Sequence, residues 1–99
     1  QALTRLRDFS SQAMANTVWA FATAGVWALT LFDAVAAETL TRLRDFSSQG
    51  MANMVWAYAT ADIAAPTLFE AIAGEAVRRL RDFNSQDMSN TVWAFATSG

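Results

Sequence analysis

The stretch N-T-V-W-A-F-A-T at residues 16–23 returns, nearly unchanged, at two later places in the chain. Its copies start at Asn16, Asn53 and Asn90, so that each begins 37 residues after the one before. A repeat with a fixed period of this size is typical of stacked supersecondary units. The sequence therefore predicts two full repeats and most of a third, 4–40, 41–77 and 78–99. Because the chain starts in mid-repeat, we expect it to be a segment of a longer array.

The repeated stretch has the spacing of an amphipathic helix. At 100° per residue, Met14 and Val18 fall on one face, whereas Gln12 and Asn16 fall on the other. These residues predict a first helix in each repeat, which we call helix A, over about 11–24 in the first copy.

Both ends of helix A carry recognisable signals. Ser10, Ser47 and Asn84 precede the three copies, and side chains of these types accept hydrogen bonds from the free N–H groups of a first turn. Gly25 follows the first copy, where a left-handed residue often ends a helix, and Asp62 takes its place in the second repeat. The ends of helix A are therefore predicted by local chemistry.

A second helix, helix B, is predicted from residue 28 or 29 to about 45. Pro66 fits the first turn of the equivalent helix in the second repeat, where its missing N–H costs nothing. Spacings of three or four residues place seven side chains on the inward face: Leu31, Phe32, Val35, Ala36, Thr39, Leu43 and Phe46. No stretch alternates with a period of two, so we predict an all-α chain, an α-solenoid of antiparallel helix pairs. We expect Trp19, Trp56 and Trp93 to fill the core between repeats.

The composition argues against catalysis. The chain has no histidine and no cysteine, and all of its basic residues are arginine. The commonest general base, the thiolate nucleophile and the commonest metal ligands are therefore missing. There is no glycine-rich phosphate loop. We predict that the protein is not an enzyme and needs no metal or cofactor.

An uncharged stretch at residues 10–32 is long enough to cross a bilayer. The matching stretch of the second repeat contains Asp62 and Pro66. Because equivalent repeats share a fold, we predict that the chain has no membrane span.

The segment S-Q-A-M-A-N-T-V-W-A-F-A-T at 11–23, followed by L-F-x-A-[VI]-A and R-L-R-D-F, resembles the octotricopeptide repeat family. The 37-residue period is closest to the heptatricopeptide variant of that family. The resemblance implies an α-solenoid that binds single-stranded RNA in mitochondria or plastids, in the processing, stability or translation of organellar transcripts. The chain departs from the family at Ser11, Ser48 and Ser85, where the family commonly has proline.

Candidate RNA contacts lie on helix A. A reader of individual bases needs positions that vary between repeats, which here are Ala13, Gly50 and Asp87, and Thr17, Met54 and Thr91. The alternative is that these positions drift because water tolerates any residue there. Constant amides suit contacts to sugar, phosphate or a base edge that do not depend on sequence, namely Gln12, Asn16, Gln49, Asn53, Gln86 and Asn90. For the asparagines we favour a structural alternative, a ladder that satisfies backbone groups between repeats.

Arginines recur near the predicted end of helix B. Arg7, Arg44 and Arg81 are one period apart and are candidates for a row that follows phosphates. The alternative is a favourable interaction with the negative end of the helix dipole. Arg42 and Arg79 each precede an aspartate by three residues, which predicts exposed ion pairs of small value.

Two functions remain open from the sequence. The first is an RNA-binding repeat module of organellar RNA metabolism. The second is a protein-interaction or architectural solenoid, such as a structural subunit of an organellar ribosome or another large complex. A net charge of −2 favours the second, because nucleic-acid modules usually carry a basic excess. Uncovered apolar faces at the ends of the array also predict self-association.

Overall fold

The computed structural model describes residues 9–25 and 29–98. Within these residues the chain forms five α-helices, two short 3-10 helices and no strand. The elements are α1 (Ser11–Thr23), α2 (Leu29–Thr41), η2 (Leu43–Asp45), α3 (Ser48–Thr60), α4 (Pro66–Arg78), η3 (Leu80–Asp82) and α5 (Ser85–Ser98). The all-α prediction is confirmed. No helix in the described part of the chain has both the length and the apolar character that a bilayer crossing needs.

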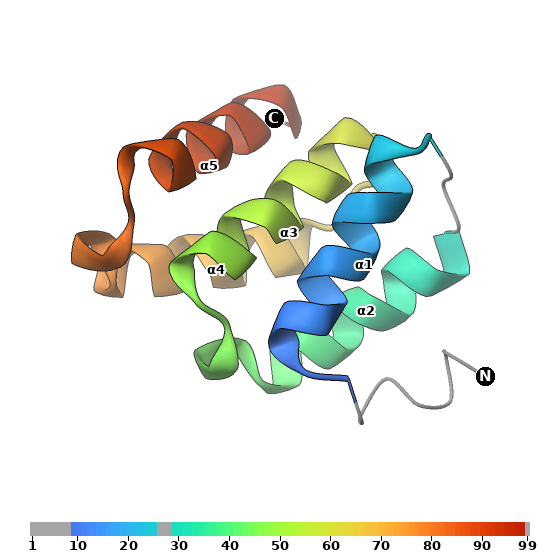
Figure 1. Cartoon of the computed structure of the whole chain (residues 1–99), viewed down its shortest axis with the longest axis horizontal. Coiled ribbons are helices and arrows are strands. Elements are labelled where there is room, and N and C mark those ends of the chain that lie inside the picture. Colours follow the sequence, from blue (N-terminus) through green and yellow to red (C-terminus); the bar gives the residue numbers. More distant parts are fainter. Residues whose placement is uncertain (1–8, 26–28, 99) are drawn as a thin grey trace.

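The helices form two layers. The three A helices α1, α3 and α5 lie side by side with α3 in the middle, and the B helices α2 and α4 lie behind them (Figure 1). The helices of each layer begin one 37-residue period apart, so that equivalent helices are neighbours. This stacking is compatible with the predicted solenoid.

Side chains cap the A helices as predicted. The Ser10 hydroxyl accepts a hydrogen bond from the N–H of Ala13 at 3.0 Å, and Ser47 does the same one repeat later. Asn84 accepts from the N–H of Asp87 at 2.7 Å. Each cap satisfies one of the N–H groups that a first helical turn leaves free. The helix starts are therefore set by local chemistry.

The residues that follow α1 and α3 adopt the predicted left-handed conformation. Gly25 has φ of 75°, and Asp62 at the equivalent position has φ of 58°. Glycine adopts this conformation without steric cost, and aspartate tolerates it better than most residues. Pro66 is the first residue of α4, as predicted. The equivalent Gly99 lies outside the described residues.

Helix B is shorter than predicted. Helix α2 ends at Thr41, and Arg42 leaves the helical region with φ of −145° and ψ of 45°. The Thr41 hydroxyl donates to the carbonyl of Glu38 at 2.7 Å. The chain then tightens into η2, and Phe46 after it is buried. The predicted end near residue 45 is wrong because a 3-10 turn separates α2 from the next A helix.

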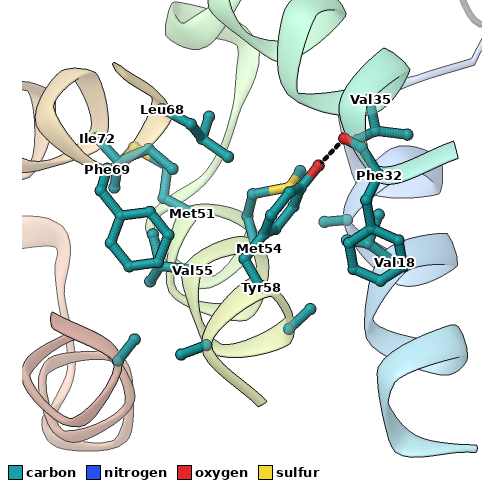
Figure 2. Close-up of a cluster of buried hydrophobic side chains, with 14 of the residues drawn as sticks. Val18, Phe32, Val35, Met51, Met54, Val55, Tyr58, Leu68, Phe69 and Ile72 are labelled. Atoms are coloured by element: carbon teal, nitrogen blue, oxygen red, sulfur yellow. Dashed lines mark hydrogen bonds between the residues drawn. The ribbon is translucent and has the colours of Figure 1, made fainter. Parts of the chain in front are cut away.

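The core lies between the two layers (Figure 2). Of the seven predicted inward side chains, five are buried, and only Ala36 and Leu43 are half-buried. The ring of Phe32 meets Tyr58 edge-on, with centroids 5.0 Å apart, and the Tyr58 hydroxyl donates to the carbonyl of Phe32. Burial raises the pKa of the Tyr58 phenol above its ordinary value. Tyr58 thus links α3 to α2 by packing and by a hydrogen bond.

Neighbouring tryptophans contact one another across repeats, but only the middle one packs against the core. Trp19 and Trp93 are 42% and 45% exposed, and Trp56 between them is half-buried. Their ring centroids are 5.9 Å and 6.4 Å apart. The prediction of a core position is wrong for Trp19 and Trp93, whereas Trp56, with a tryptophan on each side, packs against the core.

Candidate nucleic-acid interface

A groove of about 310 Å³ lies between α1 and α3. Its lining includes five of the predicted RNA contacts, Gln12 and Asn16 from α1 and Gln49, Gly50 and Asn53 from α3. Glutamine and asparagine four residues apart lie on one side of a helix. Since equivalent helices pack side by side, the repeat brings the two amide pairs together.

The asparagine amides in this groove are free of intramolecular hydrogen bonds. In the described ranges 9–25 and 29–98, no hydrogen bond joins the side chain of Asn16 or Asn53 to another group. In the third repeat the Gln86 amide donates to the side-chain oxygen of Asn90 at 3.0 Å. The predicted ladder of asparagines to backbone groups between repeats is therefore wrong for Asn16 and Asn53. Their amides remain available to a ligand.

Serines, and not the asparagines, make the hydrogen bonds between repeats. The Ser11 hydroxyl donates to the carbonyl of Asp45 at 2.9 Å, and the Ser48 hydroxyl donates to the carbonyl of Asp82 at 2.9 Å. Each bond ties the start of an A helix to the 3-10 turn of the next repeat. The sequence does contain a signal for this role that was missed. Two serines stand together at the start of each of the first two A helices, and only the first of each pair is needed as a cap. These bonds fix the spacing of the helices that form the groove.

The first variable position is buried in two of the three repeats. Gly50 is buried, and a Cβ atom there would meet the Ser47 hydroxyl at 3.2 Å. Asp87 is 5% exposed, and its carboxylate accepts from the N–H of Asn84 and from the Ser48 hydroxyl, both at 3.3 Å. The expectation of an accessible position is wrong for Asp87, because Ser48 at the start of the neighbouring helix α3 covers it. Gly50 lies at the floor of the groove, where Phe46 and Ser47 leave little space around it.

The second variable position is also poorly accessible. Met54 is fully buried, whereas Thr17 and Thr91 are half-buried, as is Ala13 of the first variable position. Both threonine hydroxyls donate to the carbonyl four residues earlier, at 2.7 Å and 2.8 Å. Base selection by these variable residues stays a prediction, and the burial of Met54 disfavours direct contact there.

The arginine candidates sit outside the groove. Arg44 and Arg81 are exposed on η2 and η3, and Arg7 lies outside the described residues. Arg44 borders a pocket beside η2 and α4 that Arg78 also lines. A phosphate-binding row of these arginines stays a prediction.

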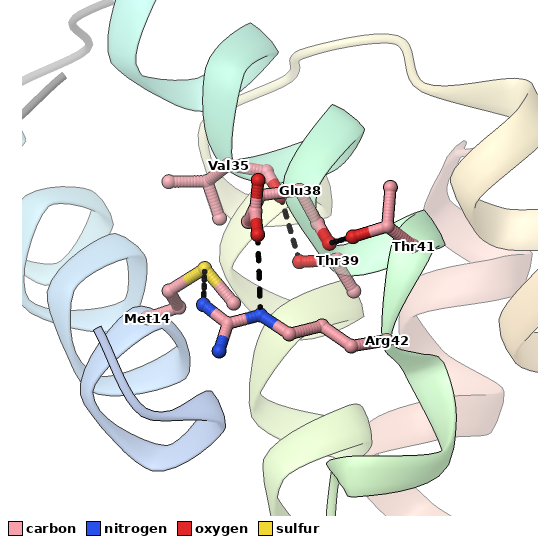
Figure 3. Close-up of polar contacts among 6 residues, drawn as sticks. All are labelled: Met14, Val35, Glu38, Thr39, Thr41 and Arg42. Atoms are coloured by element: carbon pink, nitrogen blue, oxygen red, sulfur yellow. Dashed lines mark hydrogen bonds and ion pairs between the residues drawn. The ribbon is translucent and has the colours of Figure 1, made fainter. Parts of the chain in front are cut away.

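The ion pairs of this region differ from those predicted. Arg42 pairs with Glu38 at 3.4 Å, and its guanidinium also donates to the sulfur of Met14 at 3.5 Å (Figure 3). In the next repeat Arg79 pairs with Glu75 at 3.0 Å. The prediction that each arginine pairs with the aspartate three residues later is wrong. Asp45 and Asp82 lie in the exposed 3-10 helices η2 and η3, and not on a continuing α-helix. The observed pairs instead join the last turn of each B helix to the arginine that follows it.

A model of the RNA-editing substrate-binding complex 6 protein family matches residues 1–98. The chain belongs to this family. No curated protein and no solved structure matches it. Membership of the RNA-editing substrate-binding complex 6 family bears out the sequence resemblance at a coarse level, that of an RNA-related helical family. The octotricopeptide and heptatricopeptide assignment itself gains no support, and neither does a plastid location.

Proposed function

We propose that this chain is a helical-repeat module that binds single-stranded RNA along the exposed side of α1, α3 and α5. Its family is named after a protein of an RNA-editing substrate-binding complex, and this name supports a role in organellar RNA metabolism. That complex is mitochondrial, which favours the mitochondrion. The role is binding rather than catalysis, in line with a chain that lacks histidine, cysteine and lysine.

The groove with its unpaired amides is the observation that carries this proposal. A carboxamide both donates and accepts hydrogen bonds, so that it matches a base edge, a ribose hydroxyl or a phosphate oxygen. The same glutamine and asparagine recur in every repeat. Constant contacts cannot distinguish bases, and we therefore propose recognition of single-stranded RNA with little sequence preference.

The test is a triple variant, Asn16→Ala, Asn53→Ala and Asn90→Ala, in the full chain. Each lost hydrogen bond weakens binding modestly, and three together lower the affinity by about 10-fold or more. Fluorescence anisotropy with a labelled single strand of about 12 nucleotides measures this loss.

A matched control is the double variant Thr30→Ala and Thr67→Ala. These threonines are exposed and repeat-equivalent but belong to the B helices α2 and α4. We expect the control to bind as tightly as the parent chain. Equal affinities for the asparagine variant and the control would show that the asparagines do not contact the RNA. A parent chain that binds no single-stranded RNA would refute the function.

A second candidate function is a protein-binding scaffold, and one surface favours it. Val77 on α4 and Val92 on α5 are 74% and 66% exposed, and they line an apolar groove together with Phe95. Such a surface suits a protein subunit of the same complex or another copy of the chain. It lies on different residues from the amide groove, so that the asparagine variants leave it intact.

A further inference from the structure

The three tryptophans lie on the same side of the A helices as the amides. Trp19 follows Gln12 by seven residues and Asn16 by three, spacings that place side chains on one side of a helix. The repeat copies this arrangement onto α3 and α5. The result is a row of three indoles beside a row of amides.

The indole row keeps a large exposed area. Trp19 and Trp93, at its two ends, are 42% and 45% exposed. The rings are tilted by 31° and 34° to one another at centroid distances of 5.9 Å and 6.4 Å. In the part of the chain that the structure describes, no hydrogen bond uses their indole N–H groups. Contact between repeats therefore uses only part of each ring, and both aromatic surface and donors remain for a ligand.

The charge of this side limits how a nucleic acid can lie on it. Among its described residues, the groove between α1 and α3 is lined by Asp45 and by no arginine. A phosphate backbone is repelled by a carboxylate and is normally held by Lys or Arg. Stacking of a base on an aromatic ring needs no cation and is sequence-tolerant, since every base has a π-face. The uncharged bases are thus the part of the strand that suits this side.

The regularity of the row points to the same kind of ligand. Each repeat offers one tryptophan, one glutamine and one asparagine at identical positions. Identical units one repeat apart match a polymer whose chemical unit also recurs, as the bases of a single strand do. The apolar surface at Val77 and Val92 suits a folded protein partner better.

We propose that Trp19, Trp56 and Trp93 form a base-stacking platform, with bases against the indoles and phosphates turned to solvent. This mode of binding rests on the proposed RNA-binding function and deepens it. The amides beside the indoles then meet base edges and ribose hydroxyls. Binding held mainly by stacking depends weakly on salt, because few counterions are released.

The test is the double variant Trp19→Ala and Trp93→Ala in the full chain. Both side chains are largely exposed, so the fold persists, which circular dichroism and a thermal melt verify. Loss of two stacking sites lowers the affinity for an oligoadenylate of about 12 nucleotides by about 25-fold or more. The control, Leu29→Ala, removes an exposed apolar side chain of the B helix α2 and leaves the affinity unchanged.

A second measurement uses only the parent chain. An abasic strand of the same length keeps the ribose-phosphate backbone but offers nothing to stack, so we expect it to bind at least about 25-fold more weakly than oligoadenylate. Oligoadenylate also quenches the tryptophan fluorescence, whereas the abasic strand does not. This comparison decides the question even where the double variant fails to fold.

The outcomes separate the two proposals. A parent chain that binds both strands equally, with its fluorescence unchanged, overturns the stacking platform and leaves RNA binding in place. A folded double variant that keeps the parent affinity does the same. A parent chain that binds neither strand refutes RNA binding and stacking together.

Discussion

Replacing Val55 with aspartate is expected to unfold the chain. Val55 is fully buried in the middle of α3, and a carboxylate there loses its hydration without gaining a partner. We expect the free energy of unfolding to fall by more than about 4 kcal/mol, which is most or all of the stability of a small domain. Circular dichroism in a urea titration measures the loss.

The repeat supplies the control for this variant. Val92 is the same residue one period later, on the outer helix α5, where it is 66% exposed. Val92→Asp is expected to change the free energy of unfolding by no more than about 0.5 kcal/mol. Equal, large losses at both positions would show that α5 is covered in solution, and would contradict its place as the outer helix of the described stack.

Replacing Phe32 with alanine is expected to cost about 3–5 kcal/mol of stability. Phe32 is fully buried on α2, and its ring packs edge-on against Tyr58 of α3. Its removal leaves a cavity between the two layers that neighbouring side chains fill only in part. Leu29→Ala, on the same helix but 60% exposed, is the control and stays within about 0.5 kcal/mol of the parent chain.

Urea denaturation of both variants checks this expectation. A loss at Phe32 below about 1.5 kcal/mol, the range of a conservative core change, would mean that the core does not lie between α2 and α3 as described. A loss at Leu29 as large as that at Phe32 would show that the exposed side of α2 is buried in solution.

The features of the fold that sequence predicted are those fixed by local chemistry. Caps at Ser10 and Asn84, the left-handed residue Gly25 and the first-turn Pro66 depend on neighbours within a few residues. Their effects are therefore visible in a short window of sequence. The end of α2 after Thr41 is not visible in such a window, because Arg42 is neither glycine nor proline and carries no stop signal.

Burial that depends on packing between repeats is harder to predict from the sequence. Val55 and Val92 are the same residue in the same motif, yet one is buried and the other exposed. Among the described helices, only α3 has an A helix on each side. The size of Trp19 favours a place in the core, but the residue is 42% exposed, on the side of α1 that also carries Asn16. Residue type alone therefore misplaced the side chain that we consider most informative.

The candidate site was predicted in its residues but not in its geometry. The constant amides at Gln12 and Asn16 were recognised from the repeat, whereas their meeting with the amides of α3 depends on helix packing. The serine bonds from Ser11 and Ser48 that set this packing are contacts over 34 residues, which periodicity does not reveal. Burial of Asp87 likewise arises from a neighbouring repeat.

The most direct test of the account is a nuclear magnetic resonance titration of the parent chain with single-stranded RNA of about 12 nucleotides. The side-chain amide signals of Gln12, Asn16, Gln49 and Asn53 report directly on the groove between α1 and α3. We predict that these signals shift as RNA is added, while the backbone signals of Thr30 and Thr67 on the B layer stay in place. Shifts confined to α2 and α4, with the four amide signals unmoved, would contradict RNA binding along helix A.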